Sequence, residues 1–308
     1  MTTIPGLHHV TAISGPPQPN LDFYAGLLGQ RLIKKTVNFD APDTYHLYYG
    51  DAAGSPGTIL TFFPFVDAGR GRAGPGMASA FAYAVPKPSF DDWMDKLALV
   101  AVNFEGPKTR FGQRMVTLQD PDGMHVELIE SDVGGDMHGF HSVTLWERDP
   151  DPTARILTDV FGYEAKGVEQ GGGTERLRFQ APGDAIGPIV DIIRTDAPAI
   201  GRQGAGTIHH VAFRARNDDE QRGWQEALAS VGHPTTPVID RQYFNAVYVR
   251  EPGGVLFEIA TDAPGFAVDE PAATLGQALM LPPQHERLRR QLERILPPLR
   301  VPGVDAAA

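Results

Sequence analysis

The sequence predicts an α+β fold built from four copies of one β-α-β-β-β unit. The stretch "GLHHVTAI" at 6–13 returns as "GFHSVTLW" at 139–146, and the same spacing separates His8 from Gly29 as His141 from Gly162. A second kind of copy begins with "SAFAYAV" at 79–85 and again with "IHHVAFRA" at 208–215. Each copy also holds one amphipathic helical stretch among short strands. Internal repeats on this scale indicate a repeated supersecondary unit.

The elements follow the same order in every copy: a strand, a helix that a glycine often ends, and further strands. Helices are expected at 21–28, 89–99, 153–161 and 218–232. The tight turns "PDG" and "PGG" precede the last strand of the second and fourth copies. These last strands, "MHVELIE" and "VLFEIAT", alternate so that one face suits a core and the other a cavity. The stretch at 282–300 predicts one more amphipathic helix between prolines.

A Gly- and Asp-rich stretch at 129–139 offers little to bury and predicts a boundary in the middle of the chain. We therefore expect an N-terminal half at 1–135 and a C-terminal half at 136–265, each made of two units. An extension at 266–308 with one helix would follow.

Composition narrows the function. The 308 residues carry a formal net charge of -11 with no basic stripe, which argues against nucleic acid and anionic membranes as partners. No apolar run approaches the roughly 20 residues of a membrane-spanning helix. The start, "MTTIPGLHH", lacks the features of a secretory signal, so we expect a cytoplasmic protein. Because the chain has no cysteine, any metal must be held by His, Asp or Glu.

The repeats serve as an internal control for the histidines. His9, His210 and Glu258 fall in register with Ser142, Ala80 and Glu127 of the sister copies, so only one set is complete. Two imidazoles and one carboxylate bind one face of a divalent ion and leave the opposite positions open. Such a site suits Fe(II) with a bidentate substrate and O2, and would also suit Mn(II) or Zn(II) as a Lewis acid. The alternative, strand histidines with ordinary hydrogen bonds, does not explain the common register.

Each of these histidines belongs to a doublet, and successive side chains on a strand face opposite ways. If His9 and His210 face a metal, then His8 and His209 face away and pack, unless a bulge returns them to the cavity. His46 lies on an apolar strand and is interpreted as a core histidine with its hydrogen bonds satisfied. The basic stretch "TRFGQR" at 109–114 is interpreted as structural.

The stretches "LHHVTAISG", "FYAGLLGQRLIKKTVNFD", "YHLYYGDAAGSPGTILTFFPF" and "DRQYFNAVYVREPGGVLFE" resemble the vicinal oxygen chelate superfamily. Within it, the chain resembles the hydroquinone 1,2-dioxygenases from residue 6 to about 285. The resemblance implies that the units pair into two open, barrel-like cups, with Fe(II) in one of them. It implies the metal ligands His9, His210 and Glu258, and the surrounding site residues His8, Thr11, His209, Arg241 and Tyr248. For the doublets it reverses the preference from alternation, because the family uses the first histidine as a pocket residue.

The implied activity is an Fe(II)-dependent dioxygenase that opens a substituted para-hydroquinone between a hydroxyl-bearing carbon and its neighbour. Arg241 would stabilise developing negative charge. His8 or His209 would take up and return a phenol proton, Tyr248 would donate to a bound oxygen atom, and Thr11 would orient a neighbour. The expected partners are a small aromatic diol and O2, and self-association into a homo-oligomer stays open.

Three alternatives remain at this point. A catechol-type extradiol dioxygenase would differ only in pocket detail. A glyoxalase-like isomerase would want a fourth protein ligand, which neither Ser142 nor Ala80 offers. A metal-free binding module would not need the two histidines and the glutamate.

Overall fold

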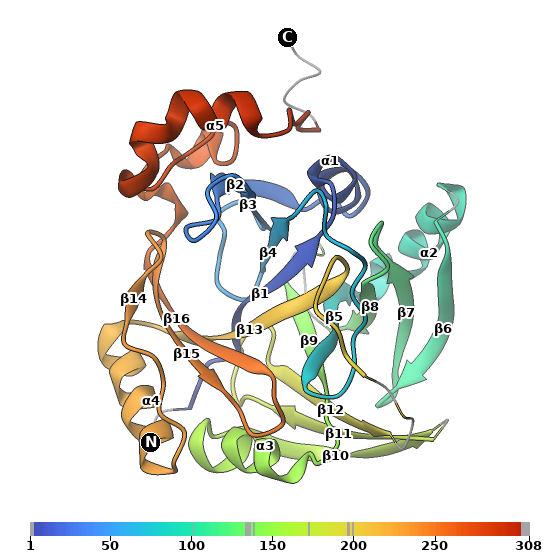
Figure 1. The fold of residues 1–308 in the computed structure, drawn as a ribbon. Helices are drawn as coiled ribbons and strands as arrows, with labels where there is room; N and C mark the ends of the chain where they lie inside the picture. The colour runs from blue at the N-terminus through green and yellow to red at the C-terminus, as the bar shows by residue number, and fades with distance from the viewer. Residues whose placement is uncertain are drawn as a thin grey trace.

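The computed structural model describes residues 3–302 except 101, 133–136, 138, 172, 196, 197 and 199. It is an α+β fold of two curled eight-stranded sheets with helices on their outer sides (Figure 1). No helix among these residues is long and apolar enough to cross a membrane. The predicted boundary at 135 and 136 falls outside the described residues, so the division into halves stays a prediction.

All four units have the predicted β-α-β-β-β order. The first unit comprises β1 (Leu7–Ser14), α1 (Pro17–Leu21) with a π-helical continuation (Asp22–Leu27), β2 (Arg31–Val37), β3 (Tyr45–Gly50) and β4 (Ile59–Pro64). The second comprises β5 (Met77–Pro86), α2 (Phe90–Leu99), β6 (Phe104–Arg110), β7 (Gln113–Gln119) and β8 (His125–Ser131). The third comprises β9 (Phe140–Trp146), α3 (Asp151–Arg155) with a π-helical continuation (Ile156–Val160), β10 (Glu164–Gly171), β11 (Thr174–Gln180) and β12 (Ile189–Thr195). The fourth comprises β13 (Thr207–Ala215), α4 (Asp218–Ser230), β14 (Ile239–Asp240), β15 (Phe244–Arg250) and β16 (Leu256–Pro264).

Two helices differ from their predicted extent by more than two residues at one end. The first begins at Pro17, earlier than expected, because proline suits the first turn, where its missing N–H is not needed. The helix expected at 282–300 is a 3-10 helix (Pro283–Leu288) followed by α5 (Arg289–Ile295). It ends there because Leu296 precedes Pro297, which disfavours helical geometry, and Leu296 is accordingly extended at ψ 134°.

Each sheet combines one of the first two units with one of the last two. The first sheet has the order β14-β15-β16-β13-β1-β4-β3-β2 and joins the first unit to the fourth; we call it the first cup. The second sheet, β10-β11-β12-β9-β5-β8-β7-β6, joins the second and third units and is called the second cup. The central pairs, β1 with β13 and β5 with β9, are antiparallel. Residues far apart in the chain therefore meet at the middle of each cup.

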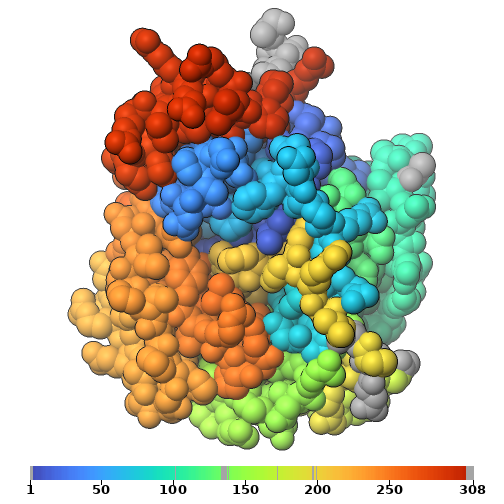
Figure 2. All heavy atoms as spheres, in the orientation of Figure 1, coloured from blue at the N-terminus to red at the C-terminus, as the bar shows by residue number. Residues whose placement is uncertain are grey.

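The sheets and helices share a large apolar core that includes Tyr24, Phe81, Phe161 and Phe257. A smaller apolar cluster around Tyr48, Tyr243 and Phe266 belongs to the first cup and to the extension that follows β16. That extension covers the outside of the first unit, as the red segment over the blue one in Figure 2 shows. A bridge between Lys35 and Leu279 ties it to β2.

Candidate metal centre

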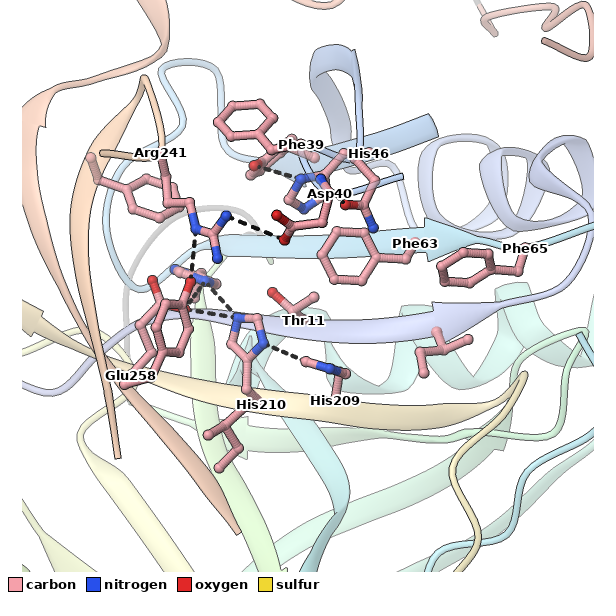
Figure 3. Close-up of a pocket in the computed structure, with 17 residues that line it drawn as sticks. Thr11, Phe39, Asp40, His46, Phe63, Phe65, His209, His210, Arg241 and Glu258 are labelled. Carbon is pink, nitrogen blue, oxygen red and sulfur yellow. Dashed lines mark hydrogen bonds and ion pairs between the residues drawn. The ribbon is translucent and has the colours of Figure 1, made fainter. Parts of the chain in front are cut away.

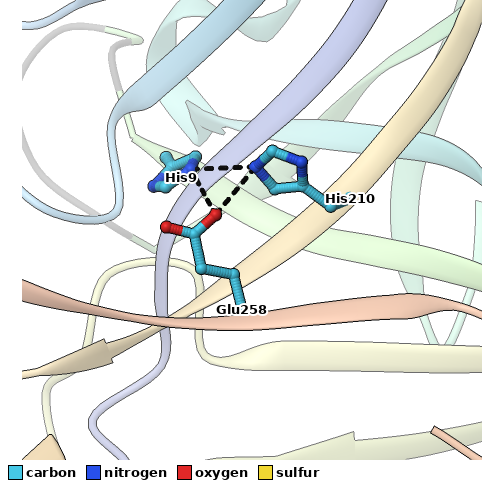
Figure 4. A group of neighbouring side chains, drawn as sticks. All are labelled: His9, His210 and Glu258. Carbon is cyan, nitrogen blue, oxygen red and sulfur yellow. Dashed lines mark hydrogen bonds and ion pairs between the residues drawn. The ribbon is translucent and has the colours of Figure 1, made fainter. Parts of the chain in front are cut away.

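Three adjacent strands of the first cup bring the predicted ligands together. His9 comes from β1, His210 from β13 and Glu258 from β16, and all three are buried (Figure 4). The two imidazole Nε2 atoms lie 3.2 Å apart. Oε2 of Glu258 lies 3.4 Å from Nε2 of His9 and 2.9 Å from Nε2 of His210. Within the described part of the chain, this is the one group of His, Asp and Glu side chains with ligand atoms so close together.

The protonation states fit a divalent cation. Burial alone would raise the pKa of Glu258, but the two imidazoles lower it well below its usual value. Burial lowers the pKa of His210 against the opposing effect of Glu258. The carboxylate of Glu258 is fully buried, and neither oxygen accepts a hydrogen bond from a described residue. Neutral imidazoles and an ionised carboxylate with converging lone pairs are the ligand forms that a metal requires.

Register shifts explain how each histidine doublet is arranged. β1 pairs Leu7 with Phe213 and His9 with Ala212, so His8 is an extra residue opposite β13. The same ladder pairs Thr11 with His210 and Ala12 with Ile208, which makes His209 the extra residue of β13. A bulge breaks the strict alternation of side chains. The opposite facing expected from alternation therefore does not hold at either doublet.

The bulges let the rings within each doublet meet. Nδ1 of His8 lies 2.9 Å from Nδ1 of His9, and Nδ1 of His209 lies 2.8 Å from Nδ1 of His210. For His9 and His210 to present Nε2 lone pairs, their Nδ1–H groups must donate to the neighbouring rings. Burial lowers the pKa of His8 to about 3 and that of His209 to about 4, so both are neutral acceptors. Such partners fix the tautomer of a metal-binding histidine.

His8 and His209, the first histidines of the two doublets, differ in their surroundings. His8 is buried, packs against Phe244 with ring centroids 5.2 Å apart, and bonds to the backbone of Thr261. It is not among the described residues that line the cavity above the centre, whereas His209 is. The resemblance placed both in the pocket; the structure brings both to the centre, and one of them to the cavity wall.

A cavity of about 370 Å³ lies over the three ligands (Figure 3). Its wall carries Thr11, Arg241 and Tyr248, which the resemblance singled out, together with His209. Aromatic side chains make up much of the rest: Phe39, Phe63, Phe65, Phe244 and Tyr48. A concave apolar site with a few convergent polar groups is suited to a small aromatic ligand.

Arg241 and Tyr248 contact each other at the cavity wall. Nε of Arg241 donates to the Tyr248 hydroxyl at 3.2 Å, and the guanidinium carbon lies 5.4 Å from the ring centroid. A guanidinium nitrogen of Arg241 also lies 3.6 Å from Oδ2 of Asp40, whose side chain is largely exposed. Burial raises the pKa of Tyr248, so its phenol stays protonated and can donate into the cavity.

His46 is a wall residue that sequence reasoning missed. Its hydrogen bonds are satisfied, as expected of a core histidine: Nε2 lies 2.9 Å from Oγ1 of Thr61, and Nδ1 lies 2.8 Å from the Tyr48 hydroxyl. Thr61 in turn lies 2.9 Å from Oγ1 of Thr11. His46, Tyr48 and Thr11 all line the cavity. Period-two alternation from β4 could have placed Thr61 on the inner face, but no sequence signal joined these strands.

The second cup holds ion pairs where the first has its ligands. Glu127 occupies the register position of Glu258, and the guanidinium of Arg110 grips both of its oxygens at 2.5 Å and 2.7 Å. Arg178 binds Asp191 in the same two-fold manner at 2.8 Å and 2.9 Å. The predicted structural role of "TRFGQR" agrees with this placement of Arg110. An arginine thus balances the carboxylate that a metal would balance in the other cup.

Paired β-α-β-β-β units that form two cups, with two histidines and a glutamate in one of them, define the vicinal oxygen chelate class of protein. The chain belongs to the Glyoxalase/Bleomycin resistance protein/Dioxygenase superfamily, whose model matches residues 6–128 and 139–259. The two matched stretches correspond to the first two and the last two units.

Individual relatives cover nearly the whole chain. It is 46% identical to "Putative ring-cleaving dioxygenase MhqO" of Bacillus subtilis, over 97% of this chain and 98% of that protein. It is 34% identical to "Chlorohydroquinone/hydroquinone 1,2-dioxygenase" of Sphingobium indicum, over 95% of this chain and 96% of that protein. A crystal structure of a Bacillus subtilis "putative dioxygenase" superposes with a TM-score of 0.91 at 44% identity, covering 98% of this chain and 99% of that one.

A more distant structure shares the fold alone. Glyoxalase I from Zea mays superposes with a TM-score of 0.64 at 13% identity, covering 83% of this chain and 92% of that one. The chain is therefore a homologue of proteins named as ring-cleaving dioxygenases, on a fold that also serves other chemistry.

Proposed function

We propose that the protein is an Fe(II)-dependent dioxygenase that opens a substituted para-hydroquinone between a hydroxyl-bearing carbon and its neighbour, with both atoms of O2 entering the product. The observation that carries this is the buried group of His9, His210 and Glu258 at the base of an aromatic-lined cavity. The name of the Sphingobium relative supports the substrate class.

The metal would be held by Nε2 of His9, Nε2 of His210 and the carboxylate of Glu258. When bound, Fe(II) supplies open coordination positions and an electron source for the reaction of an aromatic diol with O2. Mn(II) fits the same donor set. A glyoxalase-like reaction is less well supported, because the group contains three ligands among the described residues.

The side chains around the metal ligands would bind and orient the diol and stabilise charge on its oxygens. His209, neutral at the cavity wall with its Nδ1 accepting from His210, would donate a hydrogen bond from its Nε2–H to an oxygen of the diol. Arg241 would stabilise negative charge that develops on the ring oxygen, and Tyr248 would donate a hydrogen bond to an oxygen atom in the cavity. His8, held by the Thr261 backbone, would keep the His9 ring in its tautomer and orientation.

The test is O2 uptake by anaerobically Fe(II)-loaded protein with methylhydroquinone, chlorohydroquinone and catechol side by side. We expect stoichiometric O2 consumption and a ring-opened chromophore with the hydroquinones. The Mn(II)-loaded protein and metal-free protein are the controls. Uptake with catechol and none with either hydroquinone would assign the protein to the catechol-cleaving enzymes, and no uptake with any diol would refute the proposal.

A further inference from the structure

A buried ion cluster lies behind the wall of the cavity, outside the metal centre. Lys34 on β2 is fully buried, and its ammonium donates to Oδ1 of Asp269 at 2.7 Å and to Oε1 of Glu270 at 2.5 Å. Both carboxylates belong to the extension that follows β16. A buried lysine with two carboxylates is costly unless every group is engaged. The metal centre does not account for this cluster.

Asp269 reaches from the cluster to the turn that carries Arg241. Its other oxygen, Oδ2, accepts a hydrogen bond from the Gln242 side chain at 2.8 Å and one from the Tyr243 hydroxyl at 3.0 Å. The Tyr243 ring also stacks on Phe266, with centroids 5.2 Å apart. One carboxylate therefore joins β2, the extension and two consecutive residues of the β14–β15 turn.

The conformation of the β14–β15 turn depends on contacts with residues outside the turn. Gln242 has a φ of 67°, in the left-handed region that residues with side chains rarely adopt. The turn closes on itself through Arg241, whose N–H donates to the Phe244 carbonyl at 3.0 Å and whose carbonyl accepts from Tyr243 at 2.8 Å. The Gln242 conformation sets the direction in which Arg241 leaves the backbone. Surrounding contacts must stabilise such a conformation for it to persist.

We propose that Asp269 is a positioning residue for Arg241: anchored by Lys34, it holds the Gln242–Tyr243 turn so that the guanidinium stays on Tyr248 at the cavity wall. Glu270 has a different part, since its Oε1 binds Lys34 and the backbone N–H of Gly276 within the extension. The inference rests on the proposed function only in that it expects Arg241 to act on the diol.

The test replaces Asp269 in the full chain and reads activity and metal separately. Asp269→Asn leaves Lys34 balanced by Glu270 but takes the charge from the anchor of the turn. We expect kcat/KM for methylhydroquinone to fall at least tenfold with iron content unchanged, because the ligands lie on β1, β13 and β16. Asp262→Asn is the matched control. It weakens the ion pair between Asp262 on β16 and Arg214 and leaves the β14–β15 turn untouched, so it should change kcat/KM less than twofold.

A double-mutant cycle separates positioning from a general structural effect. If Asp269 acts through Arg241, then Asp269→Asn combined with Arg241→Ala is no slower than Arg241→Ala alone. Adding Gln242→Gly to Asp269→Asn should recover part of the activity, since glycine takes the left-handed conformation freely. Additive losses, or an unchanged kcat/KM, would overturn the proposal.

Two further measurements keep the result clear. If Asp269→Asn does not fold, Tyr243→Phe removes one bond to the anchor and should cause a smaller loss in the same direction. If the wild-type protein fails to consume O2 with any diol, the proposed function fails, but the positioning can still be judged. A crystal structure of Asp269→Asn should then show Arg241 away from the Tyr248 hydroxyl, and an unmoved Arg241 would refute it.

Discussion

At the scale of single residues, Glu258 is a buried acid without a hydrogen-bond partner among the described residues. Its carboxylate is fully buried beside two imidazoles. An ionised group in that position is strongly unfavourable without a cation beside it. The residue therefore makes sense as a ligand more than as a stabilising contact.

Glu258→Gln tests this directly. The amide keeps the shape of the side chain but removes the charge, so we expect iron per chain, measured by plasma emission spectroscopy after Fe(II) loading, to fall to a small fraction of the wild-type value. Full iron occupancy in the variant would exclude Glu258 as a ligand.

The hydrogen bonds from Tyr48 through His46 and Thr61 to Thr11 give a second residue-scale prediction. A phenol is the best donor of the series, so Tyr48 donates to Nδ1 of His46, His46 to Thr61, and Thr61 to Thr11. Burial keeps the pKa of His46 well below its usual value, as this neutral role requires. The Thr11 proton is then left for an oxygen atom in the cavity.

Thr61→Val breaks that series without changing the size of the side chain. We expect KM for the diol to rise about five- to tenfold, the worth of about one hydrogen bond, with iron content unchanged. Thr144→Val, at the position equivalent to Thr11 in the second cup, is the control and should leave KM unchanged. An equal rise in both variants would show a general packing effect instead.

At the scale of elements, the two bulges decide what each histidine doublet does. Alternation along β1 and β13 predicts opposite facing for His8 and His9, and the repeats identify His9 and His210 as the ligand pair. A bulge depends on the register between two strands some 200 residues apart, so neither strand alone reveals it. Only the family resemblance predicted that the first histidine of each doublet would be a site residue, because it reflects how the two strands pair in related proteins.

His8→Ala and His209→Ala form a matched pair for this arrangement. Each loses the Nδ1 partner of a ligand, but His209 borders the cavity, where water can replace it. We expect His209→Ala to keep its iron and lose about a hundredfold in kcat, by the loss of a hydrogen-bond donor to the diol oxygen. We expect His8→Ala to bind iron about 10–100-fold more weakly, because a buried partner is lost. Measured iron affinity and turnover in the reverse pattern would contradict these roles.

Glu147, which directly follows β9, is expected to make the stability of the protein depend on pH. Glu147 is fully buried beside Glu251, whose own oxygens accept from the backbone N–H groups of Gly253 and Val255. Burial, and then the charge of Glu251, raise the pKa of Glu147 to about 9 from 4.5. Folded protein thus keeps a proton that unfolded protein releases, so this residue makes the free energy of unfolding fall as pH rises from about 4.5 to about 9.

Glu147→Gln should therefore stabilise the protein at high pH and not at low pH. The amide can donate to Glu251, so we expect a gain of about 1–3 kcal/mol in the free energy of unfolding at pH 8 and almost none near pH 4.5. Urea denaturation at the two pH values measures it. An equal effect at both would show that Glu147 does not titrate with folding.

Sequence patterns predicted the repeated units, their strands and the three converging ligands, since each rests on local periodicity or on the register between copies. They did not predict Asp269, whose partners Lys34 and Gln242 are distant in the chain and are joined only by the folded extension. Nor did they predict that Glu147 is buried, because a polar residue that follows a strand is normally expected to be exposed. Long-range polar contacts leave no period in the sequence.

At the scale of the whole molecule, the ends of the sequence build the centre. His9 lies in the first unit, and His210 and Glu258 lie in the fourth, so neither end holds a complete ligand set. The middle units form a second cup of the same topology in which arginines stand against the carboxylates. The same topology thus carries the candidate metal centre in one cup and buried ion pairs in the other.

The second cup is expected to matter for stability and not for chemistry. Arg110 and Glu127 are both largely buried, and removing one partner leaves the other charge uncompensated. We expect Arg110→Met to lower the free energy of unfolding by about 3–5 kcal/mol, while iron content and kcat of the folded protein stay at wild-type values. Arg110→Met with Glu127→Leu should recover most of that loss, because an apolar pair can replace a buried ion pair. Denaturant titration and O2 uptake on the same preparations separate the two effects; a variant of normal stability with lost turnover would mean that the second cup takes part in the reaction.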